Sequence, residues 1–325
     1  MLARIAHDLY WLGRHIARAE HTARMLDGLF QVELEGGADD PRSVSLSWES
    51  VVVVMGAGSL AQPTGRSLRD DVVERLTSDR SNAVSIVSSV GAAREGARRL
   101  RDTIPAEAWE ALNTFNLELQ QRLRDGDVGT GSQSIYSYVK ESSALYWGLA
   151  AATMQRDDAH SFLFAGGRIE AAAMVLRMLR VALPPVRPTD DEGSEIPRRD
   201  GNALALLRAV GGFQAFMRSA AAPPRAEPVA RFLLFERAFP DSVAASTDFL
   251  HRMLSRADSE PGGSTAALRL ARLIADLELR RRSELGPDEL PTAFREIQHE
   301  LEQVEREIHS RYFGGDLDIP QRATA

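Results

Sequence analysis

Apolar residues recur at spacings of three, four and seven along most of this chain, which is the periodicity of helices that bury one face. The alternating pattern that is typical of half-buried β-strands is nearly absent. The periodicity, together with the glycines and prolines that interrupt it, predicts helices over residues 2–33, 43–59, 68–102, 106–124, 134–156, 162–183, 202–220, 228–236, 240–256, 264–283 and 287–313. The third of these helices has a candidate break near Asn82. The sequence therefore predicts an all-α protein whose helices pack as bundles.

Length and composition narrow the class further. A chain of 325 residues is expected to form one large domain or two modest ones. Its 44% hydrophobic and 26% charged residues exclude disorder over most of the length. The absence of cysteine excludes disulfides, thiolate metal sites and cysteine nucleophiles. A net charge of -7 argues against nucleic acid as the main partner. No apolar run is long enough to span a membrane and no secretory signal layout is present, so we expect a cytoplasmic protein.

The chain also resembles itself. Three blocks of the first half align, in the same order, with three blocks of the second: Leu12-Gly13 with Ala165-Gly166, Ser85-Ile86 with Ser242-Val243, and Asn116 to Leu119 with Asp276 to Leu279. The offset grows from 153 through 157 to 160, as small loop insertions would produce. We therefore expect a duplicated bundle with two pseudo-symmetric halves, residues 1–156 and 157–325, and a flexible linker at about 184–198. Sites often form at such a seam.

The first predicted helix has two unlike faces. One is an aliphatic stripe that is typical of a core-facing side, formed by Ile5, Leu9, Leu12, Ile16, Ala23 and Phe30. The roughly opposite face mixes cationic, aromatic and sulfur-containing side chains: His7, Trp11, Arg14, Arg18, His21 and Met25. Arginine donors in a planar fork suit a carboxylate or phosphate and can stack on an aromatic ring. This face is either an anion site or, as we favour, a structural ion-pair network or an interface.

Two segments give the chain a family resemblance. The first runs from Leu9 to Glu20 (Leu-Tyr-Trp-Leu-Gly-Arg-His-Ile-Ala-Arg-Ala-Glu) and continues with Thr22-Ala23-Arg24; the second runs from Phe162 to Met174. With shorter stretches at residues 93–98, 109–113, 232–243 and 312–313, the chain resembles alpha-E domain proteins over nearly its whole length. That family is expected to be all-helical and is named for a Glu-Arg doublet in each of two motifs.

The chain departs from the doublets that this resemblance leads us to expect. The first motif has Ala17-Arg18 and so lacks its glutamate, and the second has Glu170-Ala171 and so lacks its arginine. Gly167 also stands where an arginine is expected. If the doublets carry chemistry, this copy is weakened or inactive.

The two residues missing from the doublets predict how the motifs are arranged in space. If the two motifs face each other across the seam, Arg18 pairs with Glu170, and the partner pair was lost as a unit at Ala17 and Ala171. Losing both members of a buried pair can be neutral, whereas losing one strands a charge at a cost of about 3–5 kcal/mol. The alternative is independent erosion of two exposed positions.

The resemblance implies partners rather than a reaction. Alpha-E domains tend to be encoded beside, or fused to, circularly permuted ATP-grasp proteins, often with transglutaminase-like peptidases. We therefore expect a non-catalytic helical partner or substrate-binding subunit of a system that forms amide or peptide bonds. The candidate site or partner surface is Trp11, Arg14, Arg18, Glu20, Arg94, Glu95, Arg98 and Glu170. In it the arginines would hold a carboxylate, Trp11 would stack, and Glu170 would orient Arg18.

Two alternatives stay open: an enzyme with its own acid–base site at the seam, acting on amino acids or peptides, and a degenerate partner of a second alpha-E chain. Residues 51–61 imitate a dinucleotide fingerprint, but Pro63 would break the helix that such a motif needs. The glycine-rich residues 126–132 predict a loop between helices. His299-Glu300 opens like a zinc-protease motif, yet Gln303 takes the place of the second histidine on what we interpret as a charged, solvated helix. We assign no catalytic residue, metal or cofactor.

Overall fold

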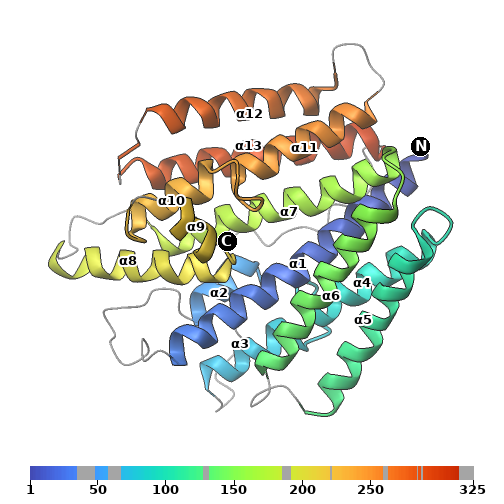
Figure 1. The fold of residues 1–325 in the computed structure, drawn as a ribbon, viewed down its shortest axis with the longest axis horizontal. Helices are drawn as coiled ribbons and strands as arrows, with labels where there is room; N and C mark the ends of the chain where they lie inside the picture. Colours follow the sequence, from blue (N-terminus) through green and yellow to red (C-terminus); the bar gives the residue numbers. More distant parts are fainter. Residues whose placement is uncertain are drawn as a thin grey trace.

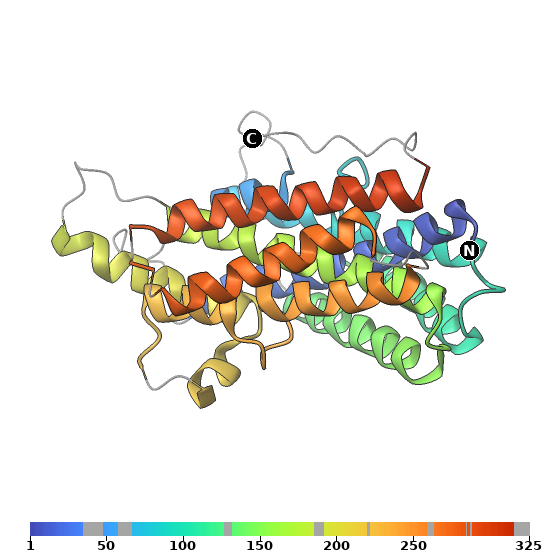
Figure 2. The same ribbon diagram turned by 90° about the horizontal axis from the view of Figure 1, so that it is seen from above.

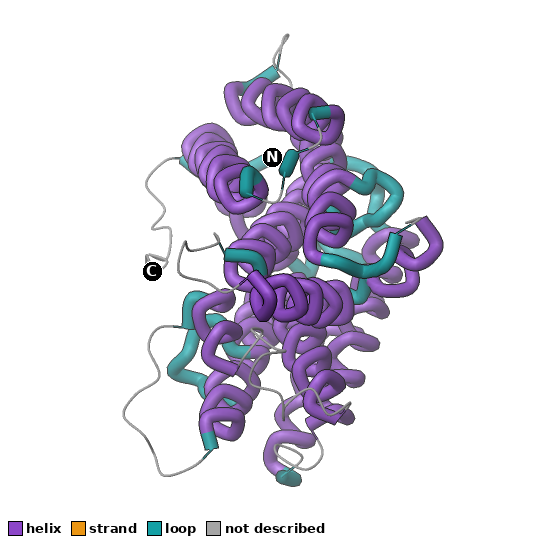
Figure 3. Tube along the Cα trace, turned by 90° about the vertical axis from the view of Figure 1, so that its left-hand side faces the viewer, coloured by secondary structure: helices purple, strands orange, loops and turns teal. Residues whose placement is uncertain are grey.

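The computed structural model describes residues 1–34, 48–57, 67–126, 132–184, 192–219, 222–258, 263–283, 285–286 and 288–314. In this part of the chain only helices and loops occur, so the all-α prediction is confirmed (Figure 3). The helices that the described residues form are α1 (Ala3–Leu34), α2 (Trp48–Met55), α3 (Leu68–Thr77), α4 (Ile86–Arg99), α5 (Ala106–Arg124), α6 (Ser132–Thr153), α7 (Asp158–Ala182), α8 (Glu192–Ala209), α9 (Phe213–Ser219), α10 (Ala226–Phe235), α11 (Val243–Ala257), α12 (Thr265–Arg282) and α13 (Leu290–Tyr312). Among the helices of the described residues, none combines the length and apolarity that crossing a membrane requires.

Helices α1 and α7 form the centre of the molecule and pack directly on each other (Figure 1). Two glycines allow this contact because each takes the place of a side chain at the crossing. A Cβ atom on Gly13 would collide with the carbonyl oxygen of Leu163, and one on Gly166 would collide with that of Tyr10. Backbone therefore meets backbone, and the side chains beside the crossing are enclosed by both helices.

The helices around this centre repeat one packing arrangement. Helix α1 contacts α4 and α6, and both of these contact α5; helix α7 contacts α11 and α13, and both of these contact α12 (Figures 1 and 2). Helix α2 packs on α7 while α8 packs on α1, so each half contributes a helix to the other. Ser85 and Ser242, which align in the sequence, each cap the helix that follows, α4 and α11. This matching supports the predicted halves 1–156 and 157–325, which stay a prediction.

The candidate break near Asn82 is present. The Asn82 side chain donates to the backbone oxygen of Arg75 at 2.9 Å and accepts from the backbone nitrogen of Val84 at 3.2 Å. These bonds replace the helical ladder in the turn between α3 and α4. Helix α7 begins at Asp158, earlier than predicted, because the Asp157 carboxylate accepts from the backbone nitrogen of His160 at 3.1 Å and caps the helix.

Two predictions about the second half are wrong. The predicted helix over 202–220 is two helices, since α8 ends at Ala209 and α9 begins at Phe213. Gly211 lies between them with φ +70°, a left-handed conformation that ends helices and favours glycine. The predicted linker at 184–198 is too long, because α8 already begins at Glu192. Residues 185–191 of that linker lie outside the described part.

Helix α1 is enclosed on both of its predicted faces. Its aliphatic stripe is buried at Leu9, Leu12 and Ile16, and the opposite face is largely buried too, with Arg14 only 1% exposed. Neighbours on several sides explain this, since α1 contacts α4, α6, α7 and α8. The cationic–aromatic face therefore points into the protein.

Candidate functional site

Glu170, on α7, lies completely buried against α1 and accepts hydrogen bonds from two arginines of that helix. Arg14 donates to its Oε2 from Nε at 2.9 Å and from Nη2 at 2.7 Å. Arg18 donates from Nε to Oε1 at 3.0 Å and from Nη2 to Oε2 at 3.1 Å. The predicted ion pair between Arg18 and Glu170 is therefore present, and it joins α1 to α7. The carboxylate that these arginines hold is one that the chain itself supplies.

Two further residues complete this cluster, which we call the Arg–Glu network: Arg14, Arg18, Glu170, Arg177 and Glu305. Nη2 of Arg177, two turns further along α7, lies 3.5 Å from Oε1 of Glu170. Glu305, on α13, accepts a hydrogen bond from Nη1 of Arg14. Arg14 is thus bonded to α7 and to α13 at once. The network ties α1, α7 and α13 together in the interior.

The electrostatics of the network favour an ionised Glu170. Burial by itself would raise the pKa of its carboxyl, but the charges of Arg18, Arg14 and Arg177 outweigh burial. The pKa of Glu170 therefore lies well below its usual range. Such a carboxylate stays charged at neutral pH and is a poor proton acceptor or donor there, because a general acid or base works best with a pKa near the operating pH.

Aromatic rings cover the other side of Arg14. Its guanidinium carbon lies 4.7 Å from the centroid of Trp11, which is a cation–π contact. Around Trp11 the structure gathers rings from α1 and from the end of α13: His7, Tyr10, His15, His309 and Phe313. Burial lowers the pKa of His309 to about 4 and that of His15 to about 3. Both imidazoles are therefore neutral at pH 7 and add no positive charge beside the arginines.

Glu20 belongs to a different contact from the Arg–Glu network. Its Oε1 accepts from Arg24, at 3.0 Å from Nε and 2.7 Å from Nη2. The two residues are one turn apart on α1, where such pairs support the helix locally. The expectation that Glu20 shares a site with Arg14 and Arg18 therefore has no support in these contacts.

Arg94, Glu95 and Arg98 lie on α4 at the surface. Nε of Arg94 donates to Oδ1 of Asn113 at 2.9 Å, and Nε of Arg98 donates to Oε2 of Glu95 at 2.9 Å. Glu95 and Arg98 are about half exposed, at 46% and 51%. Apart from Glu20, the candidate residues are thus divided between the Arg–Glu network with Trp11 at the α1–α7 crossing and a solvent-facing group on α4. Only the second group is open to a partner.

In the predicted repeat, alanine or glycine occupies the positions that align with Arg14, Arg18 and Glu170 of the Arg–Glu network. Ala17 and Ala171 are 4% and 3% exposed, which contradicts the alternative that these two positions eroded at the surface. Gly167 aligns with Arg14, and a Cβ atom there would lie 2.8 Å from the ring of Trp147. Helix α6, which carries Trp147, packs on α1 and α5 in the same way as α13 packs on α7 and α12. That a glutamate at position 17 and an arginine at position 171 were lost together, as one ion pair, stays a prediction.

Sequence reasoning missed Glu305 and Arg177. The prediction of a charged, solvated helix around His299 is wrong at Glu305, which is 8% exposed and bonded to Arg14. The available signal was its spacing from Leu301 and Ile308, one turn away on either side, which are buried. Arg177 aligns with Arg24 and lies two turns from Glu170, on the same side of α7. That spacing could have identified it.

The other sequence motifs have no site in the described structure. The valine run over 51–54 is helical, in α2, so the fingerprint lacks the strand that it requires; residues 58–61 of it, and residues 127–131 of the predicted loop, lie outside the described part. His299 contacts Gln303 at 3.1 Å. In the part of the chain that is described, no group of three or more His, Asp or Glu side chains is arranged to hold a metal ion.

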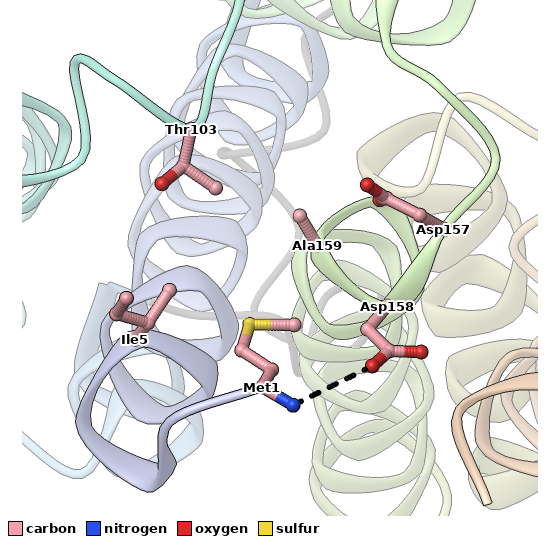
Figure 4. Close-up of a pocket in the computed structure, with 6 residues that line it drawn as sticks. All are labelled: Met1, Ile5, Thr103, Asp157, Asp158 and Ala159. Atoms are coloured by element: carbon pink, nitrogen blue, oxygen red, sulfur yellow. Dashed lines mark ion pairs between the residues drawn. The ribbon is translucent and has the colours of Figure 1, made fainter.

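A surface pocket of about 430 Å³ lies at the first turns of α1 and α7, beside the loop that follows α4 (Figure 4). It is lined by Met1, Ile5, Thr103, Asp157, Asp158 and Ala159. Figure 4 shows the amino group of Met1 pointing toward the carboxylate of Asp158, 3.8 Å away. None of the candidate residues lines this pocket.

Comparison with known proteins agrees with the sequence resemblance. The alpha-E family, described as a predicted alpha-helical domain with a conserved ER motif, matches residues 1–313. Two uncharacterized proteins, from Mycobacterium bovis and Mycobacterium tuberculosis, are each 24% identical over 331 residues, which cover 94% of this chain. The chain spans about a third, 35%, of the length of these relatives. No solved structure matches.

Proposed function

Because this chain belongs to the alpha-E family, we propose that it is a non-catalytic helical partner or substrate-binding subunit of an ATP-grasp-type system that forms amide or peptide bonds. One observation carries the proposal. The charged residues by which the family motif is recognised, Arg18 and Glu170, bond to each other in the interior. The motif therefore serves to join the two halves of a rigid helical unit, and binding is left to the surface.

The arginines of the Arg–Glu network already hold a carboxylate of the chain itself. This supports a division in which the buried motif has a structural role and the surface binds the partner. A ligand carboxylate that reached Arg14 would have to displace Glu170 from two short hydrogen bonds, which takes one of its three arginines away from that buried carboxylate. Breaking a buried ion pair costs up to about 3–5 kcal/mol, which few ligand contacts repay. The solvent-facing residues of α4, with Arg94, Glu95 and Arg98, carry no such cost. They are the candidate partner surface.

The relatives support an association with a further domain. In them, the segment similar to this chain is about a third of a longer protein. A helical unit of this kind is thus joined covalently to other sequence in those proteins. We propose that the present unit acts with a circularly permuted ATP-grasp protein, which would carry out the ATP-dependent step. A transglutaminase-like peptidase or a second alpha-E chain are the other candidate partners.

The alternative of an enzyme with its own acid–base site at the seam is disfavoured by one feature. The acid that the seam offers at the motif, Glu170, is buried and has a pKa far below neutrality. Such a group does not exchange protons with a substrate at neutral pH. An acid–base reaction at this seam would need other groups than those of the motif.

The experiment combines co-purification with an assay of ATP consumption. The chain is co-expressed with the circularly permuted ATP-grasp protein of the same organism, and ATP use is measured for each protein alone and for both together, with amino acids supplied. We expect a complex, faster ATP consumption by the complex than by the ATP-grasp protein alone, and none by this chain alone. ATP-dependent ligation by the isolated chain would favour the enzyme alternative, and absence of a complex would refute the proposal.

Surface variants locate the contact. Exchange of both Arg94 and Arg98 for alanine should weaken the complex about tenfold, the range for interface residues that matter, while the far-UV circular dichroism spectrum stays unchanged because both side chains are on the surface of α4. Arg272→Ala, on the exposed side of α12, is the matched control and should leave binding within about twofold. Equal effects of both changes would rule out α4 as the contact.

A further inference from the structure

Three aromatic rings from three helices form a row across α7. The ring centroid of Trp147, on α6, lies 5.3 Å from that of Phe164, on α7, and the centroid of Phe164 lies 6.2 Å from that of Phe249, on α11. All three rings are partly exposed. The rings pack against the core and leave part of their apolar surface accessible beside one another. The row crosses from the first half of the chain to the second.

Arginines surround this row. The guanidinium carbons of Arg168 and Arg252 lie 5.4 and 5.5 Å from the ring centroid of Phe249. Arg156 and Arg256 lie close enough to His160 for their charges to help burial in lowering the pKa of His160 to about 4. We call the set Trp147, Arg156, Phe164, Arg168, Phe249, Arg252 and Arg256 the aromatic–arginine face.

Little negative charge offsets these four arginines. Asp241 pairs with Arg168 at 3.0 Å, Asp157 caps α7, and Asp248 is engaged by Arg237 at 3.2 Å. Arg252 and Arg256 are exposed, and the described residues offer neither of them an ion pair or a hydrogen bond. They stand one turn apart on α11, where two like charges repel each other. The face therefore carries surplus positive charge on a chain whose net charge is -7.

The corresponding surface of the first bundle lacks this surplus. Helix α4 packs on α1 and α5 in the same way as α11 packs on α7 and α12. Its exposed arginines are neutralised, since Arg98 pairs with Glu95 at 2.9 Å and Arg99 pairs with Asp8 at 3.0 Å. The open arginines therefore belong to one side of the molecule, the side where Gly167 makes room for the ring of Trp147.

We propose that the aromatic–arginine face binds an acidic segment of a partner polypeptide, in which Asp or Glu side chains alternate with apolar ones. Guanidinium forks match carboxylates in geometry and charge. The ring row offers apolar area beside them, and arginine and aromatic side chains are enriched in the well-bound centres of interfaces. A long polyanion such as a nucleic acid would meet four arginines here and net repulsion elsewhere. This inference does not depend on the ATP-grasp proposal, and either can fail alone.

The test measures fluorescence anisotropy of a labelled synthetic peptide of glutamate and leucine, titrated with the full chain at low salt. A matched peptide with lysine in place of glutamate is the first control. We expect binding of the acidic peptide only, and weakening by added salt because the arginines are exposed. Arg252→Glu combined with Arg256→Glu should lower the affinity at least about tenfold.

A charge-matched variant separates this face from general electrostatics. Arg80→Glu combined with Arg272→Glu changes the net charge equally, at exposed positions beyond α3 and on α12, and should keep the affinity within about twofold. Phe249→Leu should weaken binding without changing charge, since it shortens the ring row. Absence of acidic-peptide binding, an equal loss in the charge-matched control, or tighter binding of a single-stranded oligonucleotide of the same charge would overturn the proposal.

Discussion

Exchange of Glu170 for glutamine removes one charge from the Arg–Glu network and hardly changes the volume of the side chain. The carboxylate accepts four hydrogen bonds from Arg14 and Arg18 and lies 3.5 Å from Arg177. A glutamine offers one oxygen to these donors and turns an amide NH₂ toward the rest. The arginines would then keep only Glu305 as a counter-charge within the network.

The magnitude follows from burial. Glu170 is 0% exposed and Arg14 is 1% exposed, so water cannot solvate the charges that lose their partner. Removing one member of a buried ion pair destabilises a protein by about 3–5 kcal/mol. The matched control is Glu95→Gln on α4, because Glu95 and its ion-pair partner Arg98 are both about half exposed. A surface pair contributes no more than about 1 kcal/mol.

Urea denaturation at pH 7, followed by far-UV circular dichroism, measures both variants against the unchanged chain. We expect the free energy of unfolding to fall by about 3–5 kcal/mol for Glu170→Gln and by less than about 1 kcal/mol for Glu95→Gln. If Glu170→Gln costs no more than Glu95→Gln, the network does not hold the two halves together, and the structural interpretation of the motif is wrong.

Three further predictions concern pH, the helix crossing and the lost pair. The pKa of His309 is about 4 in the folded chain against 6.5 in the unfolded chain, so the unfolded state binds the proton first. His309 should therefore account for up to about 3 kcal/mol of the stability that is lost as the pH falls from 6.5 to 4, in addition to the losses due to His15 and His160. Urea titrations of His309→Phe should show a loss smaller by about this amount, and a loss equal to that of the unchanged chain would contradict the assignment. Gly13→Ala should lower the free energy of unfolding by about 3 kcal/mol or more, because α1 and α7 must separate to admit the methyl group. The control is Gly91→Ala, whose new methyl group meets nothing within 4 Å and should stabilise the chain by up to about 1 kcal/mol. Thermal denaturation compares the two variants, and similar melting temperatures would argue against the close crossing of α1 and α7. Ala17→Glu and Ala171→Arg should each destabilise alone and compensate by more than about 1 kcal/mol together, and an additive double-mutant cycle would show that these positions never faced each other.

Features set within a few residues could be predicted from the sequence. The helices follow from apolar spacing, and the break near Asn82 follows from a side chain that bonds to nearby backbone. The Arg18–Glu170 pair was also predictable, because the repeat relates the two motifs and the pattern of loss relates their charges. Each of these rests on local interactions or on a comparison of the chain with itself.

Other features required the tertiary structure. The sequence showed that Trp11 and Arg14 share a helical face and that Glu170 pairs with Arg18, but not that Glu170 also bonds to Arg14 or that α13 provides Glu305 as a second anion. It grouped the α4 residues with the same site, although they lie on the surface. Glu305 stands 291 residues from Arg14, and helical periodicity carries no information on which distant helix a face will meet.

By itself, then, the sequence determined an all-α chain, its family and one ion pair between its motifs. The packing of α1, α6, α7, α11 and α13 decided which charges are buried and satisfied and which are left open at the surface. The physical reason is that helix formation depends on neighbours within a turn or two, whereas the solvation of a charge depends on everything that surrounds it after folding.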